Sequence, residues 1–124
     1  MRSAPYFAAI GFLTIAHAIR VIRLRRKHRV AFGDGGVNEL LIATRVFGNH
    51  AEYAPIGLIM LLALEFVLAP AWCLHLAGSM LVLGRIIHAT GLPRGIMKFR
   101  VAGMILTFAS IAVASLGIFV FSIT

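Results

Sequence analysis

The chain has 124 residues, of which 60% are hydrophobic and only 13% are charged, and its mean hydropathy is +0.96. A water-soluble domain of this length could not bury so much apolar surface, so the composition predicts a protein whose solvent is largely lipid. The formal net charge of +8 would by itself fit nucleic-acid binding. The single cysteine, Cys73, excludes an intrachain disulfide and a four-cysteine zinc site, and we expect no metal site.

The positive charges are concentrated in two short segments that interrupt the apolar sequence. The first is the arginine-rich stretch RVIRLRRKHR at residues 20–29, and the second contains Arg94, Lys98 and Arg100. Clusters of lysine and arginine between apolar spans are typical of cytoplasmic loops. The charge therefore indicates membrane topology, and we expect no nucleic-acid partner.

Four apolar segments in chain order predict four transmembrane helices, at about residues 4–22, 37–67, 72–90 and 101–123. The first runs into a basic segment and not into a cleavage site, which favours a permanent span over a signal peptide. The second is long for one span and contains Pro55, which predicts a kink. Asp34, in the glycine-rich connection before it, is expected to cap it. Both basic loops then lie on one side, expected to be cytoplasmic, and both termini lie on the other.

The sequence thus predicts an all-α integral membrane protein, with a single four-transmembrane-helix bundle domain over residues 1–124. Polar residues on the second predicted helix share one face of it. Arg45, Asn49 and Glu52 are at positions i, i+4 and i+7, and Tyr53 is adjacent. Charged side chains at the edge of the hydrocarbon layer are costly and are seldom kept there without a role. His50, among them, is expected to be interfacial and solvated.

The third predicted helix carries Arg85 and His88, three residues apart and therefore on one face. Because this helix runs toward the second basic segment, both polar stripes are expected at the same membrane depth. Together they predict a pocket for a zwitterionic or anionic ligand, since arginine matches carboxylates and Glu52 accepts an ammonium group. Two alternatives stay open at this point. In the first, ion pairs such as Arg45–Glu52 or Arg85–Glu52 serve only to hold the helices together. In the second, the polar residues form an ion or proton pathway.

The pattern Arg45-x-x-x-Asn49-x-x-Glu52-Tyr53-x-Pro55, followed by an apolar run, resembles the second-helix signature of the MAPEG family. These are the membrane-associated proteins in eicosanoid and glutathione metabolism. Further matches follow in order along the chain: Arg25-Arg26, Arg85-x-x-His88, Arg94 and Arg100. The segment RLRRKHRVAFGDGG is most similar to the small bacterial branch of the family, and the resemblance covers essentially the whole chain.

The resemblance implies a homotrimer in the bacterial inner membrane that binds glutathione, as a co-substrate, between neighbouring subunits near the cytoplasmic face. It implies a transferase or peroxidase-like enzyme that detoxifies lipophilic substrates arriving from the bilayer. The nucleophile is the thiolate of bound glutathione, and a nearby cation favours the thiolate over the thiol. The implied glutathione-binding residues are Arg45, Asn49, Glu52, Tyr53, Arg85, His88 and Arg25. The implied catalytic residues are Arg100, Arg94 and Arg26.

The chain also departs from the family pattern at the sulfur end of the implied site. Leu92 stands where several eicosanoid enzymes of the family have a tyrosine, so one ligand contact is missing. The arginine that activates the sulfur in family transferases aligns with Arg100 or Arg94 only if a gap is introduced into the alignment. Two alternatives to an enzyme therefore remain: a membrane trimer that binds a lipid or small molecule without catalysis, and a small proton-coupled exporter.

Overall fold

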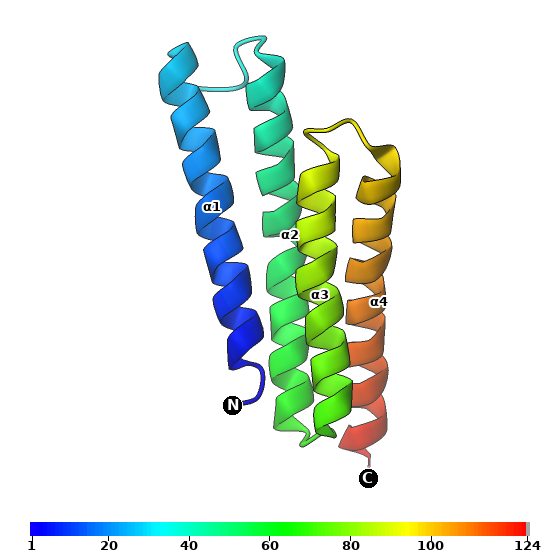
Figure 1. Cartoon of the computed structure of the whole chain (residues 1–124). Helices are drawn as coiled ribbons and strands as arrows, with labels where there is room; N and C mark the ends of the chain where they lie inside the picture. The colour runs from blue at the N-terminus through cyan, green and yellow to red at the C-terminus, as the bar shows by residue number, and fades with distance from the viewer. Residues whose placement is uncertain (124) are drawn as a thin grey trace.

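The structure is a computed structural model that describes residues 1–123. These residues form four α-helices in sequence: α1 (Ala4–His28), α2 (Asn38–Phe66), α3 (Ala71–Gly91) and α4 (Met97–Ser122). Each helix runs antiparallel to the next (Figure 1). The α1–α2 and α3–α4 connections therefore lie at one end of the bundle, called the basic end below, and both chain termini lie at the other. The predicted helical fold is confirmed.

Three helices, α1, α3 and α4, are long and apolar enough to cross a membrane. The second helix does not reach that hydropathy, because the polar residues Asn49, His50 and Glu52 interrupt its apolar sequence. Much of the outer surface is formed by large apolar side chains, among them Phe12, Ile105 and Phe119. Such a surface suits hydrocarbon as the surrounding solvent.

The two basic segments are more helical than predicted. Helix α1 continues through the first of them to His28, and α4 begins at Met97, so that Lys98 and Arg100 lie in its first turn. Leucine, arginine and lysine are good helix formers, and no glycine or proline interrupts the first segment before Gly33. The prediction that Asp34 caps α2 is wrong. Its side chain instead accepts a hydrogen bond from the Gly36 N–H at 3.0 Å, within the turn.

Small residues bring α3 and α4 close together. A Cβ atom on Gly103 would lie only 2.5 Å from the backbone nitrogen of His88. The Ser110 hydroxyl donates to the Ala77 carbonyl oxygen at 2.7 Å. The buried face of α4 is made of small residues: Gly103, Thr107, Ser110, Ala114 and Gly117. This close approach holds the polar face of α3 directly against α4.

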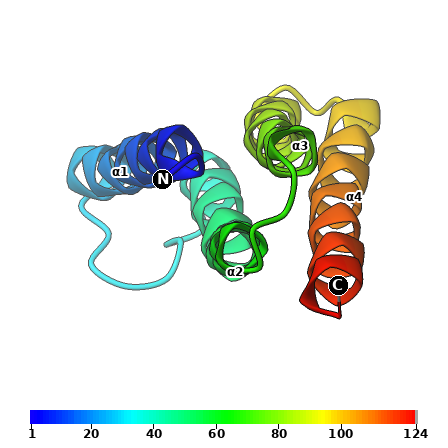
Figure 2. The same ribbon diagram turned by 90° about the horizontal axis from the view of Figure 1, so that it is seen from below.

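Helix α1 packs on the other side of the bundle from α4 (Figure 2). Near the basic end, Val21 and Leu24 pack against Leu40 of α2. At the other end, Glu65 of α2 accepts hydrogen bonds at the start of α1, from the Ser3 N–H at 3.1 Å, the Ser3 hydroxyl and the Arg2 N–H. Glu65 thus satisfies backbone donors that the first turn of a helix leaves free.

Candidate ligand-binding site

Arg85 lies at the centre of the site and is only 2% exposed. It sits on the face of α3 that turns toward α2 and α4. Its Nε and Nη2 atoms donate to the Thr107 hydroxyl of α4 at 3.1 and 2.7 Å. Its Nη1 atom donates to the Asn49 side-chain oxygen of α2 at 2.7 Å. One guanidinium therefore joins three helices, and the two polar stripes lie at the same level.

The charge of Arg85 has no anionic partner in the described part of the chain. Within residues 1–123, the ion pairs involve only Glu39 and Glu65. The partners of Arg85 are instead neutral groups, and the Tyr53 ring lies 5.8 Å from its Cζ atom in a cation–π contact. A buried charge is normally paired, because leaving water is costly for an isolated ion. Within residues 1–123, neutral hydrogen-bond acceptors and the Tyr53 ring are therefore the partners of this buried charge.

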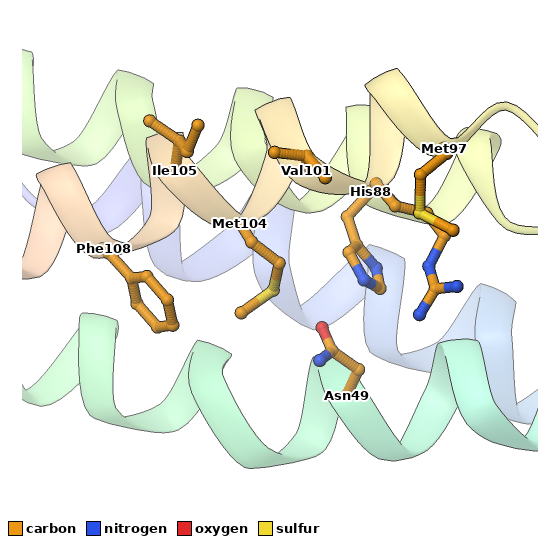
Figure 3. Close-up of a pocket in the computed structure, with 8 residues that line it drawn as sticks. Asn49, His88, Met97, Val101, Met104, Ile105 and Phe108 are labelled. Atoms are coloured by element: carbon orange, nitrogen blue, oxygen red, sulfur yellow. The ribbon is translucent and has the colours of Figure 1, made fainter.

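A cavity of about 360 Å³ lies beside this cluster, between α2 and α4 (Figure 3). It is lined by Asn49, His88, Met97, Arg100, Val101, Met104, Ile105 and Phe108. In Figure 3 the Asn49 amide and the His88 ring approach each other, whereas Phe108 and Ile105 lie further along the cavity. The cavity is therefore amphipathic, and it can hold a polar group and an apolar group side by side.

The predicted stripe on α2 is divided between two environments. Asn49 and Tyr53 turn inward toward Arg85, but Arg45 and Glu52 are exposed on the outer side of the helix. Neither exposed residue forms an ion pair within residues 1–123. The Arg45–Glu52 and Arg85–Glu52 pairs that would only hold helices together are therefore not present within the described residues.

The predicted catalytic arginines are also separated. Arg100 lines the cavity, whereas Arg94 is exposed in the α3–α4 connection and is not part of the lining. Arg25 donates to the carbonyl oxygens of Ala31 at 3.3 Å and Gly33 at 2.9 Å, and so holds the α1–α2 connection. Arg26 follows it on α1, a helix that lies on the other side of α2 from α4 (Figure 2), and it is not part of the cavity lining. Within one chain, only Arg100 of this group reaches the cavity.

Two site features were not predicted. Thr107 accepts two hydrogen bonds from Arg85, and its position seven residues after Arg100 on the same helix was the available signal. The prediction that His50 is solvated is wrong, because the residue is 3% exposed. Its Nε2 atom lies 2.9 Å from the Thr14 hydroxyl, and its ring centroid lies 5.1 Å from that of His17.

Four packed apolar helices, with a buried cation and an amphipathic cavity at one level of the bundle, place the protein in the class of helical membrane proteins. The chain belongs to the MAPEG family, whose model matches residues 3–120. Its relatives include the "Inner membrane protein YecN" of Escherichia coli K12, which is 37% identical over 111 residues, or 90% of this chain and 85% of that protein. The protein of the same name from Escherichia coli O6:H1 has the same identity and coverage. No solved structure matches the chain with significance.

The family resemblance inferred from the sequence is thereby confirmed. The protein is an integral membrane protein, since three of its helices have the length and hydropathy of spans and its relatives are named as membrane proteins.

Proposed function

We propose that the protein binds glutathione and acts as a glutathione transferase or peroxidase-like enzyme on hydrophobic electrophiles. The observation that supports this best is the buried Arg85 guanidinium, which has no carboxylate partner in residues 1–123 and lies beside an amphipathic cavity. Glutathione carries two carboxylates, an ammonium group and a thiol, and arginine forks match carboxylates well. Membership of the MAPEG family supports the same ligand.

In this proposal α2 is the fourth membrane span. Helices α1 and α3 run in the same direction (Figure 1), so a chain that crosses the membrane in both must return between them, and α2 connects them. We place the protein in a bacterial inner membrane, as the name of its relatives indicates for them. The basic end faces the cytoplasm, following the positive-inside rule, and both termini face the other side.

The exposed residues on α2 support a homotrimer. A charged side chain that faces lipid is costly and is seldom kept without a partner or a role. Arg45 and Glu52 are both exposed on the outer side of α2 and have no ion-pair partner in the described residues. A neighbouring subunit and its glutathione would cover both. The trimer is the assembly that the family resemblance implies.

Each polar residue then takes one part of the tripeptide. Glu52 accepts the γ-glutamyl ammonium group, and Arg45 and Asn49 bind a carboxylate and the peptide. Tyr53 adds a hydrogen bond and His88 lines the cavity, while the buried Arg85 lies behind them and supplies a positive charge. The apolar part of the cavity, near Ile105 and Phe108, receives the hydrophobic substrate from the bilayer.

The chemistry follows from the cation at the cavity. A free thiol has a pKa of about 8.5, and a fixed positive charge nearby favours the thiolate, which is the nucleophile. Arg100 is the arginine that lines the cavity, and we assign it this role. The thiolate attacks an electrophilic carbon to form a C–S bond, and the displaced electron pair leaves with the leaving group or takes up a proton.

Calorimetric titration with glutathione tests the binding part of the proposal. Glu52→Ala should lose the measurable heat of binding, because the ammonium group loses its counter-charge, while the mass of the assembly stays the same. Glu39→Ala is the matched control: it removes an exposed carboxylate from the same helix whose partner is Lys27. Unchanged affinity in Glu52→Ala would contradict the proposal.

A second candidate function is that of a trimer that binds glutathione or a lipid without catalysis. Leu92, which stands in place of a family tyrosine, favours this function. Ultraviolet absorbance of the thiolate separates the two readings. An enzyme generates this absorbance on binding glutathione at neutral pH and loses it in Arg100→Ala. A non-catalytic binder generates none.

A further inference from the structure

A cleft of about 270 Å³ lies between α1 and α2, apart from the cavity beside Arg85. Its apolar walls are formed by Phe7 and Ile10 of α1 and by Phe47 and Leu58 of α2. None of the residues that line it belongs to the proposed glutathione site or lines the cavity beside Arg85. The cleft is therefore a separate feature of the molecule.

Pro55 leaves a backbone acceptor at this cleft. Proline has no N–H, so the carbonyl oxygen of Ala51, four residues earlier on α2, loses the donor that a helix normally supplies. Both residues line the cleft. Hydrocarbon has no water to replace that donor, and no side chain within residues 1–123 donates to this oxygen. The cleft thus contains a carbonyl oxygen without its usual partner.

The polar side chains in the lining have no free donor. The Thr14 hydroxyl donates its only proton to the Ile10 carbonyl oxygen at 2.8 Å. The His50 Nε2 atom lies 2.9 Å from the same hydroxyl, so it must carry the imidazole proton and donate it to the Thr14 oxygen. The lining therefore suits a ligand that brings a hydrogen-bond donor of its own.

The size and the opening of the cleft indicate a small ligand that comes from the lipid. A Cβ atom on Gly11 would meet no atom within 4 Å, so the glycine leaves open space in the lining. Gly11, Ala51 and Pro55 are all exposed, so the cleft opens on the surface of the bundle. An apolar cavity of about 150 Å³ can hold benzene, and the larger cleft here suits a molecule of one or two rings.

We propose that this cleft binds a lipophilic hydroxyl compound of one or two rings, such as a phenol, which enters from the bilayer. The apolar walls hold the rings, and the hydroxyl donates to the Ala51 carbonyl oxygen. A compound of the same shape without a hydroxyl leaves that oxygen unsatisfied and binds less tightly. The inference does not rest on the proposed glutathione chemistry, because the two sites share no lining residue.

Calorimetric titration of the protein in lipid nanodiscs tests this, with 1-naphthol and 1-methylnaphthalene as probes of nearly equal shape. Empty nanodiscs, titrated in the same way, give the heat of partition into lipid, which is subtracted. The wild type should bind 1-naphthol about fivefold more tightly, which is the factor that one net hydrogen bond contributes. Equal affinities for the two probes would overturn the proposal.

Two variants separate the hydrogen bond from the space. Pro55→Ala restores the missing N–H, so it should abolish the preference for 1-naphthol and preserve the binding of 1-methylnaphthalene. Gly11→Leu fills the open space and should abolish saturable binding of both probes. Ala16→Leu is the matched control for added bulk, because Ala16 is exposed on the same helix and does not line the cleft. It should leave both affinities unchanged.

Three further results would overturn the proposal. Equal losses in Gly11→Leu and Ala16→Leu would place the probes on the general surface of α1 and not in the cleft. Displacement of 1-naphthol by glutathione would place the probe in the cavity beside Arg85. A changed mass of the Gly11→Leu assembly, measured by light scattering, would assign the cleft to contact with a second copy of the chain.

Discussion

Polar residues on the inner and outer sides of α2 have opposite environments, although all of them lie between Arg45 and Tyr53. On the inner side, Asn49 accepts a hydrogen bond from Arg85 and Tyr53 lies against the same guanidinium. On the outer side, Arg45 and Glu52 are exposed and have no ion-pair partner within residues 1–123. Within residues 1–123 the inner polar residues have interaction partners, whereas the charges on the outer side have no ion-pair partner.

The difference matters because the membrane interior has no water to solvate unpaired charge. Inner residues can therefore contribute to the stability of the fold by themselves. Outer residues contribute little to the fold, and we expect them to act when a ligand and a neighbouring subunit are present. Substitutions on the two sides should accordingly separate stability from binding.

The largest expected effect on stability is that of Arg85→Ala. This change leaves the Asn49 and Thr107 oxygens without their donor in a buried site and opens a cavity. We expect a loss of about 3 kcal/mol in the free energy of unfolding, since each unsatisfied buried group costs about 1–3 kcal/mol. Unfolding of the detergent-solubilised protein by mixed-micelle denaturation measures it. Arg45→Ala should stay within about 0.5 kcal/mol of the wild type. Equal losses in both variants would remove the distinction between the two sides.

A smaller effect is expected for Thr107→Val, which preserves the shape of the side chain and removes its hydroxyl. Two hydrogen bonds from Arg85 then lose their acceptor. The free energy of unfolding should fall by about 1–2 kcal/mol, and Thr107→Ser should recover most of it because the hydroxyl returns. The same denaturation assay measures both. A Thr107→Ser variant as weak as Thr107→Val would mean that methyl packing, not the hydrogen bonds, matters at this position.

Much of the helical fold could be predicted from the sequence, because apolar segments of membrane-span length report directly on helices. The contact between Arg85 and Asn49 was also within reach, since the direction of each helix places both at one level. The length of α1 could not be predicted. Clustered arginine and lysine indicate the side of the membrane and not the local conformation, so they predict a loop here and not the continuation of the helix.

The sequence could not predict, for a geometric reason, which polar residues of α2 face inward and which face outward. Residues at i, i+4 and i+7 share a face only to within several tens of degrees, and the boundary between inside and outside runs through that interval. The burial of His50 could have been predicted more easily. It lies four residues from both Val46 and Ala54, which are buried, and that phase places it inside the bundle. Its polar neighbours suggested an interface instead.

The most direct test of the account is a crystal structure of the protein grown with glutathione. We predict density for the tripeptide against Arg45 and Glu52, with its ammonium group at the Glu52 carboxylate and a second copy of the chain on its other side. Arg45 and Glu52 facing detergent or lipid, without ligand or neighbouring subunit, would contradict it.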